Sequence, residues 1–182
     1  LNAAGTAWRF LTYAGGLNAD TAYGVAVDSA GSVFVAGATA STSFPVSAAA
    51  YQTVNRGSYD AFVLKLTSSG ALSYSTLYGG GGSDTAAAVA VDMEGYAWAG
   101  GYTNSANLPL VSPVQASWAG SFDGFVVRIA PDGSSVPFAT YLGGTGDDRI
   151  QSLFLTPAGG VLLAGMTNSA DFPPSMRPPL PP

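Results

Sequence analysis

Apolar residues occur along the chain in short runs, each broken by Gly, Ser, Asp or Pro. In GVAVDS (24–29) and SVFVAGAT (32–39), small or apolar side chains alternate along the run, which is typical of β-strands. The turn DSAG between them begins with Asp28 and ends with Gly31. Asp can accept a hydrogen bond from a following backbone N–H, and Gly tolerates a positive φ. The pattern therefore predicts a β-hairpin.

A second pair of runs follows, DAFVLKLT (60–67) and ALSYSTLYG (71–79). β-Branched and aromatic residues fill both runs, as is typical of strands. The turn at 67–70 corresponds to APDG at 130–133, which has Pro in the second position and Gly in the fourth. No helical periodicity of useful length occurs. Together the two hairpins predict one four-stranded antiparallel sheet.

The whole pattern repeats along the chain. FLTYAGG (10–16) recurs as YSTLYGG (74–80) and FATYLGG (138–144), which gives a period of 64 residues. One residue is missing inside the second copy, so SYDAFVLKL (58–66) matches SFDGFVVRI (121–129) at an offset of 63. A fixed period of this kind indicates a repeat architecture. The positions that recur in register include Asp20, Asp84 and Asp148; Gly31, Gly95 and Gly159; Thr39, Thr103 and Thr167; and Ser41, Ser105 and Ser169.

A four-stranded sheet that recurs at this spacing predicts an all-β fold of β-propeller type, in which four-stranded antiparallel blades pack face to face. The strands in this chain account for about 2.5 to 3 blades. The predicted organisation is an outer strand of a preceding or shared blade at 1–16, centred on 8–15, blade 1 at 17–79, blade 2 at 80–143, the first hairpin of blade 3 at 144–173 and a Pro-rich tail or linker at 174–182.

The string YSTLYGGGGSDTAAAVAVDMEGYAWAGGYTNSANLP (74–109), followed by a DAFVLKL-type strand, resembles the SBBP repeat, the "seven-bladed β-propeller" repeat of exported bacterial and archaeal proteins. The resemblance extends over about residues 10–173. It implies a propeller fold and an extracellular or cell-surface location, but no particular reaction. The third copy departs from the pattern, because Thr156 replaces an Asp, Arg149 and Ile150 replace small residues, and a DAFV-type strand is lacking.

The composition of the chain excludes several classes of function. Only 9% of the residues are charged, against about 25% in an average soluble domain, and the net charge is −5. This balance argues against a nucleic-acid partner, because binding to phosphates requires a Lys/Arg surface. The absence of Cys and His excludes disulfides, thiol or imidazole catalysis and the usual zinc sites. The mean hydropathy of +0.27 arises from strand-length runs, and none is long enough for a transmembrane helix.

Recurring carboxylates offer candidate metal ligands. GGTGDDRI (143–150) fits the pattern G-G-x-G-x-D-x-U-x of calcium-binding repeats, GGGGSDTA (79–86) fits it except at U, and GGLNADTA (15–22) fits it in part. Carboxylate and carbonyl oxygens suit calcium, and no other cofactor is expected. The alternative is that the glycines form a tight crossing between strands while the Asp side chains cap backbone N–H groups. The candidate calcium ligands are Asp20, Asp84, Asp147 and Asp148.

The other recurring Asp residues are in framework positions. Asp60 and Asp123 each precede an apolar strand, and Asp28 and Asp92 each begin a turn. Acid–base catalysis on a substrate requires suitably placed titratable groups, usually a pair of carboxylates where His is absent. The sequence leaves no such pair to nominate, so we expect a protein that is not an enzyme.

Two features are candidate glycan or partner contacts. The loop QASWAGS (115–121) carries a Trp that does not recur in the other copies, and it can stack on a sugar or pack under its own loop. The Ser/Thr-rich loops TASTS (39–43) and TNSAN (103–107) are candidates for O-linked glycans. The candidate contact residues are Trp118, Thr39, Ser41, Thr103 and Ser105.

The blade count leads to two functional hypotheses. A closed propeller needs about four to eight blades, and an open array exposes apolar faces and strand edges. We therefore expect a piece of a longer chain or a subunit that associates with other copies, and the Pro-rich end (172–182) would be a linker or an arm on a neighbour. The first hypothesis is a non-catalytic extracellular structural protein that builds a surface fibre, layer or scaffold. The alternative is an adhesive module that binds glycan or protein, stabilised by calcium.

Overall fold

The computed structural model describes residues 1–2 and 4–173, and these residues form β-strands and loops without a helix. The Pro-rich tail predicted at 174–182 lies outside the described residues. Among the residues described, there is accordingly no helix that could span a membrane. The strands are β1 (Asp20–Val27), β2 (Val33–Thr39), β3 (Asp60–Leu66), β4 (Leu72–Tyr78), β5 (Asp84–Val91), β6 (Ala97–Thr103), β7 (Asp123–Ile129), β8 (Phe138–Leu142), β9 (Asp148–Leu155) and β10 (Val161–Thr167).

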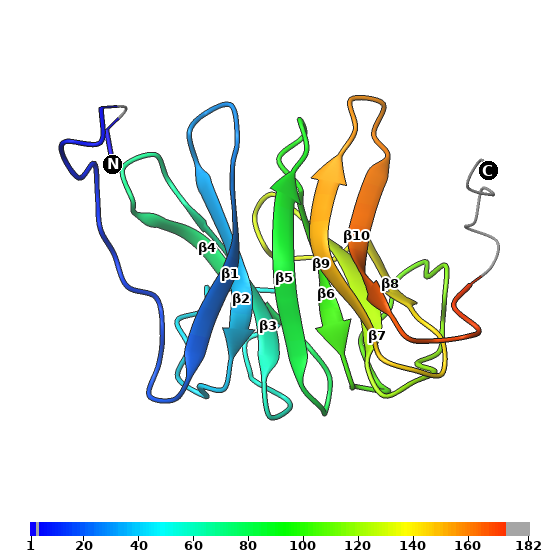
Figure 1. The fold of residues 1–182 in the computed structure, drawn as a ribbon. Helices are drawn as coiled ribbons and strands as arrows, with labels where there is room; N and C mark the ends of the chain where they lie inside the picture. Colours follow the sequence, from blue (N-terminus) through cyan, green and yellow to red (C-terminus); the bar gives the residue numbers. More distant parts are fainter. Residues whose placement is uncertain (3, 174–182) are drawn as a thin grey trace.

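Strands β1 to β4 form one antiparallel sheet in sequence order, and β5 to β8 form a second. Strands β9 and β10 pair as a separate two-stranded sheet. The three sheets stand side by side, and each first strand contacts the first strand of the next sheet, β1 with β5 and β5 with β9 (Figure 1). The predicted all-β fold with four-stranded antiparallel blades is confirmed. The two complete sheets are called blades 1 and 2 below, and the β9–β10 hairpin is the third sheet.

Residues 1–2 and 4–19 contain no strand, which corrects the outer strand predicted at 8–15. An outer strand pairs with the third strand of its own blade, as β4 pairs with β3. The described residues hold no third strand with which 8–15 could pair. Phe10 nevertheless lies against Gly70 in the β3–β4 turn, as Tyr74 of β4 lies against Gly133 in the β7–β8 turn. The segment therefore occupies the place of an outer strand without its ladder of hydrogen bonds.

The hairpin turns have the geometry that the sequence predicts. In each, the N–H of the fourth residue donates to the carbonyl of the first, with N···O distances of 2.9 to 3.0 Å. The fourth residue is always a glycine with positive φ, for example Gly95 at 85° and Gly133 at 75°. Near the start of each first strand the pairing register shifts by one residue, between Ala22 and Gly24 in β1 and between Ala86 and Ala88 in β5. Such β-bulges increase strand twist locally.

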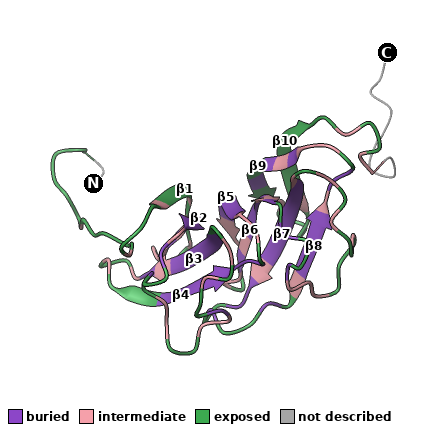
Figure 2. Cartoon of the chain, turned by 90° about the horizontal axis from the view of Figure 1, so that it is seen from below, coloured by how far each residue is buried: buried purple, intermediate pink, exposed green. Residues whose placement is uncertain are grey.

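Blades 1 and 2 share one hydrophobic core, which contains residues from both sheets, including Phe34, Val63, Phe125 and Val127. Small residues allow the first strands to approach closely, since a Cβ added at Gly24 would lie 3.1 Å from the Ala88 Cα. Figure 2 shows buried segments concentrated in the middle of the molecule, whereas β1 and β10 at its two ends are largely exposed. Strands between two sheets are thus more buried than the strands β1 and β10 at the two ends.

The two end sheets expose apolar side chains. Val25 on β1 is 68% exposed, whereas its repeat equivalent Val89 on β5 is only 7% exposed because blade 1 covers it. At the other end, Phe154 of β9 and Leu162 of β10 are 62% and 58% exposed. A face that is core at the internal junction is therefore in contact with solvent at both ends.

Two glycines of blade 2 provide a matched test of this packing. Gly95→Ala adds a methyl group with ordinary contacts to Pro131, so we expect only the cost of a positive φ, about 1 kcal/mol. Gly133→Ala places the same methyl group 2.5 Å from the Tyr74 ring, and we expect a loss about 1 to 3 kcal/mol larger. Urea denaturation of both variants measures the difference. Equal losses would show that the contact between blades contributes nothing at this turn.

Candidate functional site

The first strand of every sheet begins with an aspartate whose carboxylate holds the crossing from the preceding segment. Two consecutive glycines precede each crossing, and the second donates its N–H to that carboxylate. The N···O distance is 2.7 Å for Gly16 to Asp20, for Gly80 to Asp84 and for Gly144 to Asp148. The proposed capping role is therefore observed at all three positions.

Hydroxyl groups from the end of the second strand complete this arrangement. Thr39 donates to Asp20, and Thr103 donates to Asp84. The equivalent serines, Ser41 and Ser105, donate to the same carboxylates, each at 3.0 Å. These four hydroxyl residues are at most 2% exposed. These hydroxyls, predicted as glycan contacts, are buried and hydrogen-bonded to the framework.

A second buried aspartate begins the third strand of each complete blade. Asp60 accepts the N–H of Arg56 at 3.0 Å and that of Gly57 at 3.2 Å. Asp123 accepts two backbone N–H groups of its own preceding loop in the same way, from Ala119 and Gly120. Both side chains are 0% exposed. Their framework role, predicted from their place before an apolar strand, is observed.

Sequence reasoning missed a glutamine that supports each of these aspartates. Gln52 donates its side-chain N–H to Asp60, and Gln115 donates to Asp123 at 3.1 Å. The side-chain carbonyl of Gln52 accepts the Gly79 N–H at 3.1 Å, so one amide joins the loop to the crossing. A signal was present, because the two glutamines recur at the same offset of 63 residues as the two aspartates.

The two kinds of aspartate meet across each crossing. A Cβ added at Gly79 would lie 2.6 Å from the Asp60 Cγ and 2.8 Å from an Asp84 oxygen. The pKa of Asp60 is raised to about 6, mainly because the carboxyl group is buried. The hydrogen bond from the Arg56 N–H lowers this pKa, and the nearby Asp84 carboxylate raises it. Burial likewise raises the pKa of Asp84. Both carboxyl groups are 0% exposed, so a substrate cannot reach them.

The predicted calcium ligands do not form a suitable donor set. Calcium takes about 6 to 8 oxygen ligands, yet the oxygens of Asp20 and Asp84 accept hydrogen bonds from backbone and hydroxyl donors. Asp147 forms an ion pair with Arg149 at 2.7 Å. One oxygen of Asp148 is buried without a hydrogen-bond partner. Within the described part of the chain, no group of three or more acidic side chains lies close enough to hold a metal ion.

Trp118 is partly buried and packs against the core shared by blades 1 and 2. Its indole nitrogen is buried. The ring is therefore not presented as a free platform for stacking on a sugar, and of the two interpretations of this residue the structure favours packing.

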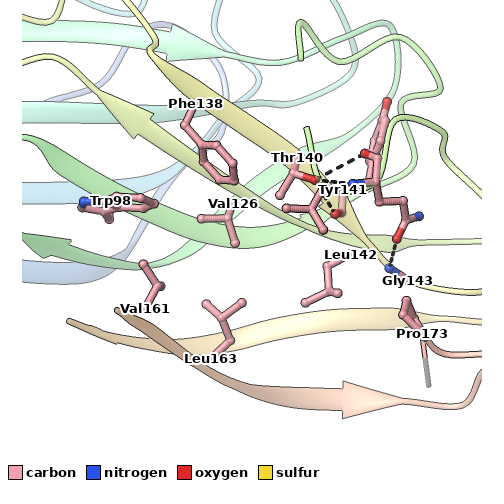
Figure 3. A pocket seen from close by; sticks show the side chains of 12 residues that line it. Trp98, Val126, Phe138, Thr140, Tyr141, Leu142, Gly143, Val161, Leu163 and Pro173 are labelled. Carbon is pink, nitrogen blue, oxygen red and sulfur yellow. Dashed lines mark hydrogen bonds between the residues drawn. The ribbon is translucent and has the colours of Figure 1, made fainter. Parts of the chain in front are cut away.

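An open apolar slot of about 570 Å³ lies between blade 2 and the β9–β10 hairpin (Figure 3). The sequence analysis did not predict it, because it arises where strands are missing from the third sheet. Gln115 and Thr140 are polar residues of its lining, and the backbone N–H of Gln115 donates to the Thr140 hydroxyl at 2.9 Å. The apolar wall residues are Trp98, Val126, Phe138 and Leu142 from blade 2 and Val161 and Leu163 from β10.

The buried carboxyl groups predict that acidification stabilises the fold. Between the unfolded pKa near 4 and the folded pKa of Asp60 near 6, the folded chain holds protons that the unfolded chain releases. The free energy of unfolding should therefore be higher at pH 5 than at pH 7, and we expect a melting temperature higher by at least about 2 °C. The raised pKa of Asp123 acts in the same direction.

Carbon-13 NMR of the Asp60 carboxyl group provides the direct measurement, with a titration midpoint expected near pH 6. Exposed Asp132 is the internal control, because hydrogen bonds from Ser134 lower the pKa of its carboxyl group. A melting temperature that rises from pH 5 to pH 7 would contradict the assignment.

We also expect calcium and a chelator to leave the melting temperature unchanged, because the carboxylate oxygens already accept N–H and O–H donors. Differential scanning calorimetry with added calcium and with EDTA tests this. Magnesium at equal ionic strength is the control for charge screening. A stabilisation specific to calcium would restore the metal hypothesis for Asp147 and Asp148.

Comparison with known proteins agrees with this architecture. Two segments, residues 9–45 and 73–109, match the family model described as SBBP, beta-propeller repeat. The first match begins within segment 8–15 and the second within β4. Each includes the crossing that follows and the first hairpin of the next sheet. No curated protein matches the chain. The matched segments stand 64 residues apart, in the register of the internal repeat, and so the resemblance to the SBBP β-propeller repeat is confirmed for these two segments.

Proposed function

We propose that the protein is a non-catalytic structural protein, located outside the cell or on its surface, whose propeller blades associate with further blades or other copies. The observation that carries this proposal is the contrast between equivalent faces. Val25 is 68% exposed where Val89, its counterpart at the internal junction, is 7% exposed. The outward face of β1 is apolar like the buried face of β5, but it is exposed to solvent. A further blade packed against it would bury it.

The N-terminal segment supports the same proposal. Leu11, Tyr13 and Leu17 are 68%, 94% and 91% exposed. Phe10 is seated in the place of an outer strand, but the segment lacks the third strand that would pair with it. Large apolar side chains on an unpaired segment mark an interaction site when they lie beside an exposed apolar sheet.

The distribution of carboxylates supports a non-catalytic role. The recurring aspartates are buried in the strand crossings or are engaged in turns, for example Asp92, which accepts Arg128 at 2.7 Å. Acid–base catalysis requires a group within hydrogen-bond reach of a substrate, and the carboxyl groups with raised pKa are not accessible. A framework that uses its acids for backbone capping suits a scaffold. The location outside the cell is what the repeat family implies.

The adhesive alternative has less support. The hydroxyl residues proposed to contact glycans are buried, and Trp118 packs against the core. Among the described residues, exposed apolar side chains such as Val25, Phe154 and Leu162 lie instead on the outer faces of the end sheets. Those faces are suited to another blade more than to a sugar, because their edges carry unpaired backbone groups.

Self-association of the full chain tests the proposal. We expect sedimentation velocity to show oligomers that increase with concentration. Val25→Glu introduces a charge on the outward face of β1 and should shift the population to monomer, while circular dichroism stays unchanged because the side chain is largely exposed.

Met93→Glu is the matched control, since Met93 is 99% exposed and lies in the β5–β6 turn of blade 2, outside strand β1. It should associate like the unmodified chain. A chain that remains monomeric at every concentration, or a Val25→Glu variant that associates normally, would rule out assembly of copies through this face.

A further inference from the structure

The third sheet contains only the first two strands of a blade. In blades 1 and 2 the second strand pairs on its far edge with a third strand, and the ladders run from Thr39↔Asp60 to Val33↔Leu66 and from Thr103↔Asp123 to Ala97↔Ile129. Within the described residues, β10 pairs with β9 alone. The far edge of β10 therefore presents free backbone donors and acceptors, which are a template for strand addition.

The slot of Figure 3 lies directly beside that edge, and its walls have counterparts at the complete junction. By the repeat register, the wall residues Trp98, Val126, Phe138 and Leu142 correspond to Phe34, Val63, Tyr74 and Tyr78. All four counterparts are buried in the core between blades 1 and 2. The slot is thus one half of a blade junction, with its second half missing.

The complete junction identifies what fills the second half. The core that buries Phe34, Val63, Tyr74 and Tyr78 also contains alternate residues of a third strand, which come from β7: Phe125, Val127 and Ile129. Alternate residues of a strand point to one face of its sheet. A third strand beside β10 would place the same three positions into the slot.

A buried polar atom at the start of β9 points to the same missing element. One carboxylate oxygen of Asp148 is buried without a partner, whereas the matching oxygens of Asp20 and Asp84 accept the hydroxyls of Thr39 and Thr103. Those two threonines are 0% exposed, each opposite the first residue of a third strand. Thr167, the third-copy equivalent, is exposed and its hydroxyl makes no bond to Asp148. A third strand would cover Thr167 as it covers the other two.

We propose that the free edge of β10 and the apolar slot form an acceptor site for one antiparallel β-strand with the sequence pattern of this repeat's third strand, Asp-x-Phe-Val-x-basic-aliphatic. This inference rests on the proposed association of blades. The donor is a further repeat whose third strand is unpaired, because β3 and β7 are each held between two neighbours in their own sheets. The register follows from blade 2, with the strand's Asp opposite Thr167 and the Val that follows its Phe, the counterpart of Val126, opposite Ala164.

A synthetic peptide of residues 121–130, SFDGFVVRIA, tests the site on the full chain. We expect saturable binding in titration calorimetry, and at least tenfold weaker binding when Phe125→Asp is introduced into the peptide. Trp98→Ala in the chain should weaken binding by a similar factor, because it removes one wall of the slot. Phe154→Ala, on an exposed position of β9 that does not line the slot, is the control and should bind normally.

Cross-linking tests the register and does not depend on the Trp98 variant folding. The chain has no cysteine, so a single Ala164→Cys in the exposed part of β10 is the only thiol available. A peptide carrying Val126→Cys should form a disulfide with it. Leu162→Cys lies two residues away on the same strand and faces the counterpart of Arg128, so it should cross-link several times more slowly.

The outcomes separate this inference from the proposed function. Binding of a scrambled peptide as strong as that of the third-strand peptide, or equal cross-linking at 164 and 162, would overturn the acceptor site. Self-association of the chain that persists in that case would leave the association of blades supported through β1. Specific peptide binding by a chain that remains monomeric would support the acceptor site and contradict assembly of copies through the β1 face.

Discussion

The hydrogen bond between a glycine N–H and the carboxylate that begins the next sheet holds each blade crossing together. The same carboxylate accepts the hydroxyl of a threonine at the end of the second strand in blades 1 and 2, and a serine hydroxyl in all three copies. One side chain thereby joins the crossing and the two strands of a hairpin. Because the group is taken out of water, its ionised form depends on these donors. The relative placement of successive sheets is set at this point.

The crossings also explain why an acidic chain has so little charge available for other chemistry. Aspartates recur because each copy needs one at the start of its first strand, and each complete blade needs another at the start of its third. Glycine is required beside them, since a side chain at Gly79 or Gly143 would collide with two carboxyl groups at once. The polar residues are therefore concentrated at the crossings, and the faces of the blades are left apolar. Polar crossings combined with apolar blade faces favour a role in assembly more than a role in catalysis.

The strands and their turns could be predicted from the sequence because three copies repeat the same pattern and correct one another. The Asp caps could also be predicted, since Asp20, Asp84 and Asp148 follow glycine pairs in register. The partners of these caps could not. Thr39 and Ser41 stand in a polar stretch that resembles an exposed loop, and only the fold shows that the crossing buries them. The segment 8–15 has a strand pattern, but a ladder requires a third strand beside it, and the described residues hold none that pairs with it.

The two ends of the row of blades differ from each other. One end presents the outward face of β1 with the unpaired segment 8–15, and the other presents the unpaired edge of β10 beside its slot. A contact between unlike faces is heterologous, so each addition leaves the same pair of unlike ends exposed. A twofold dimer would bury one kind of end and leave the other open. An assembly in which every copy has both ends covered is therefore polar, with all copies pointing the same way along it. It stops growing only when the rotation from blade to blade closes a ring.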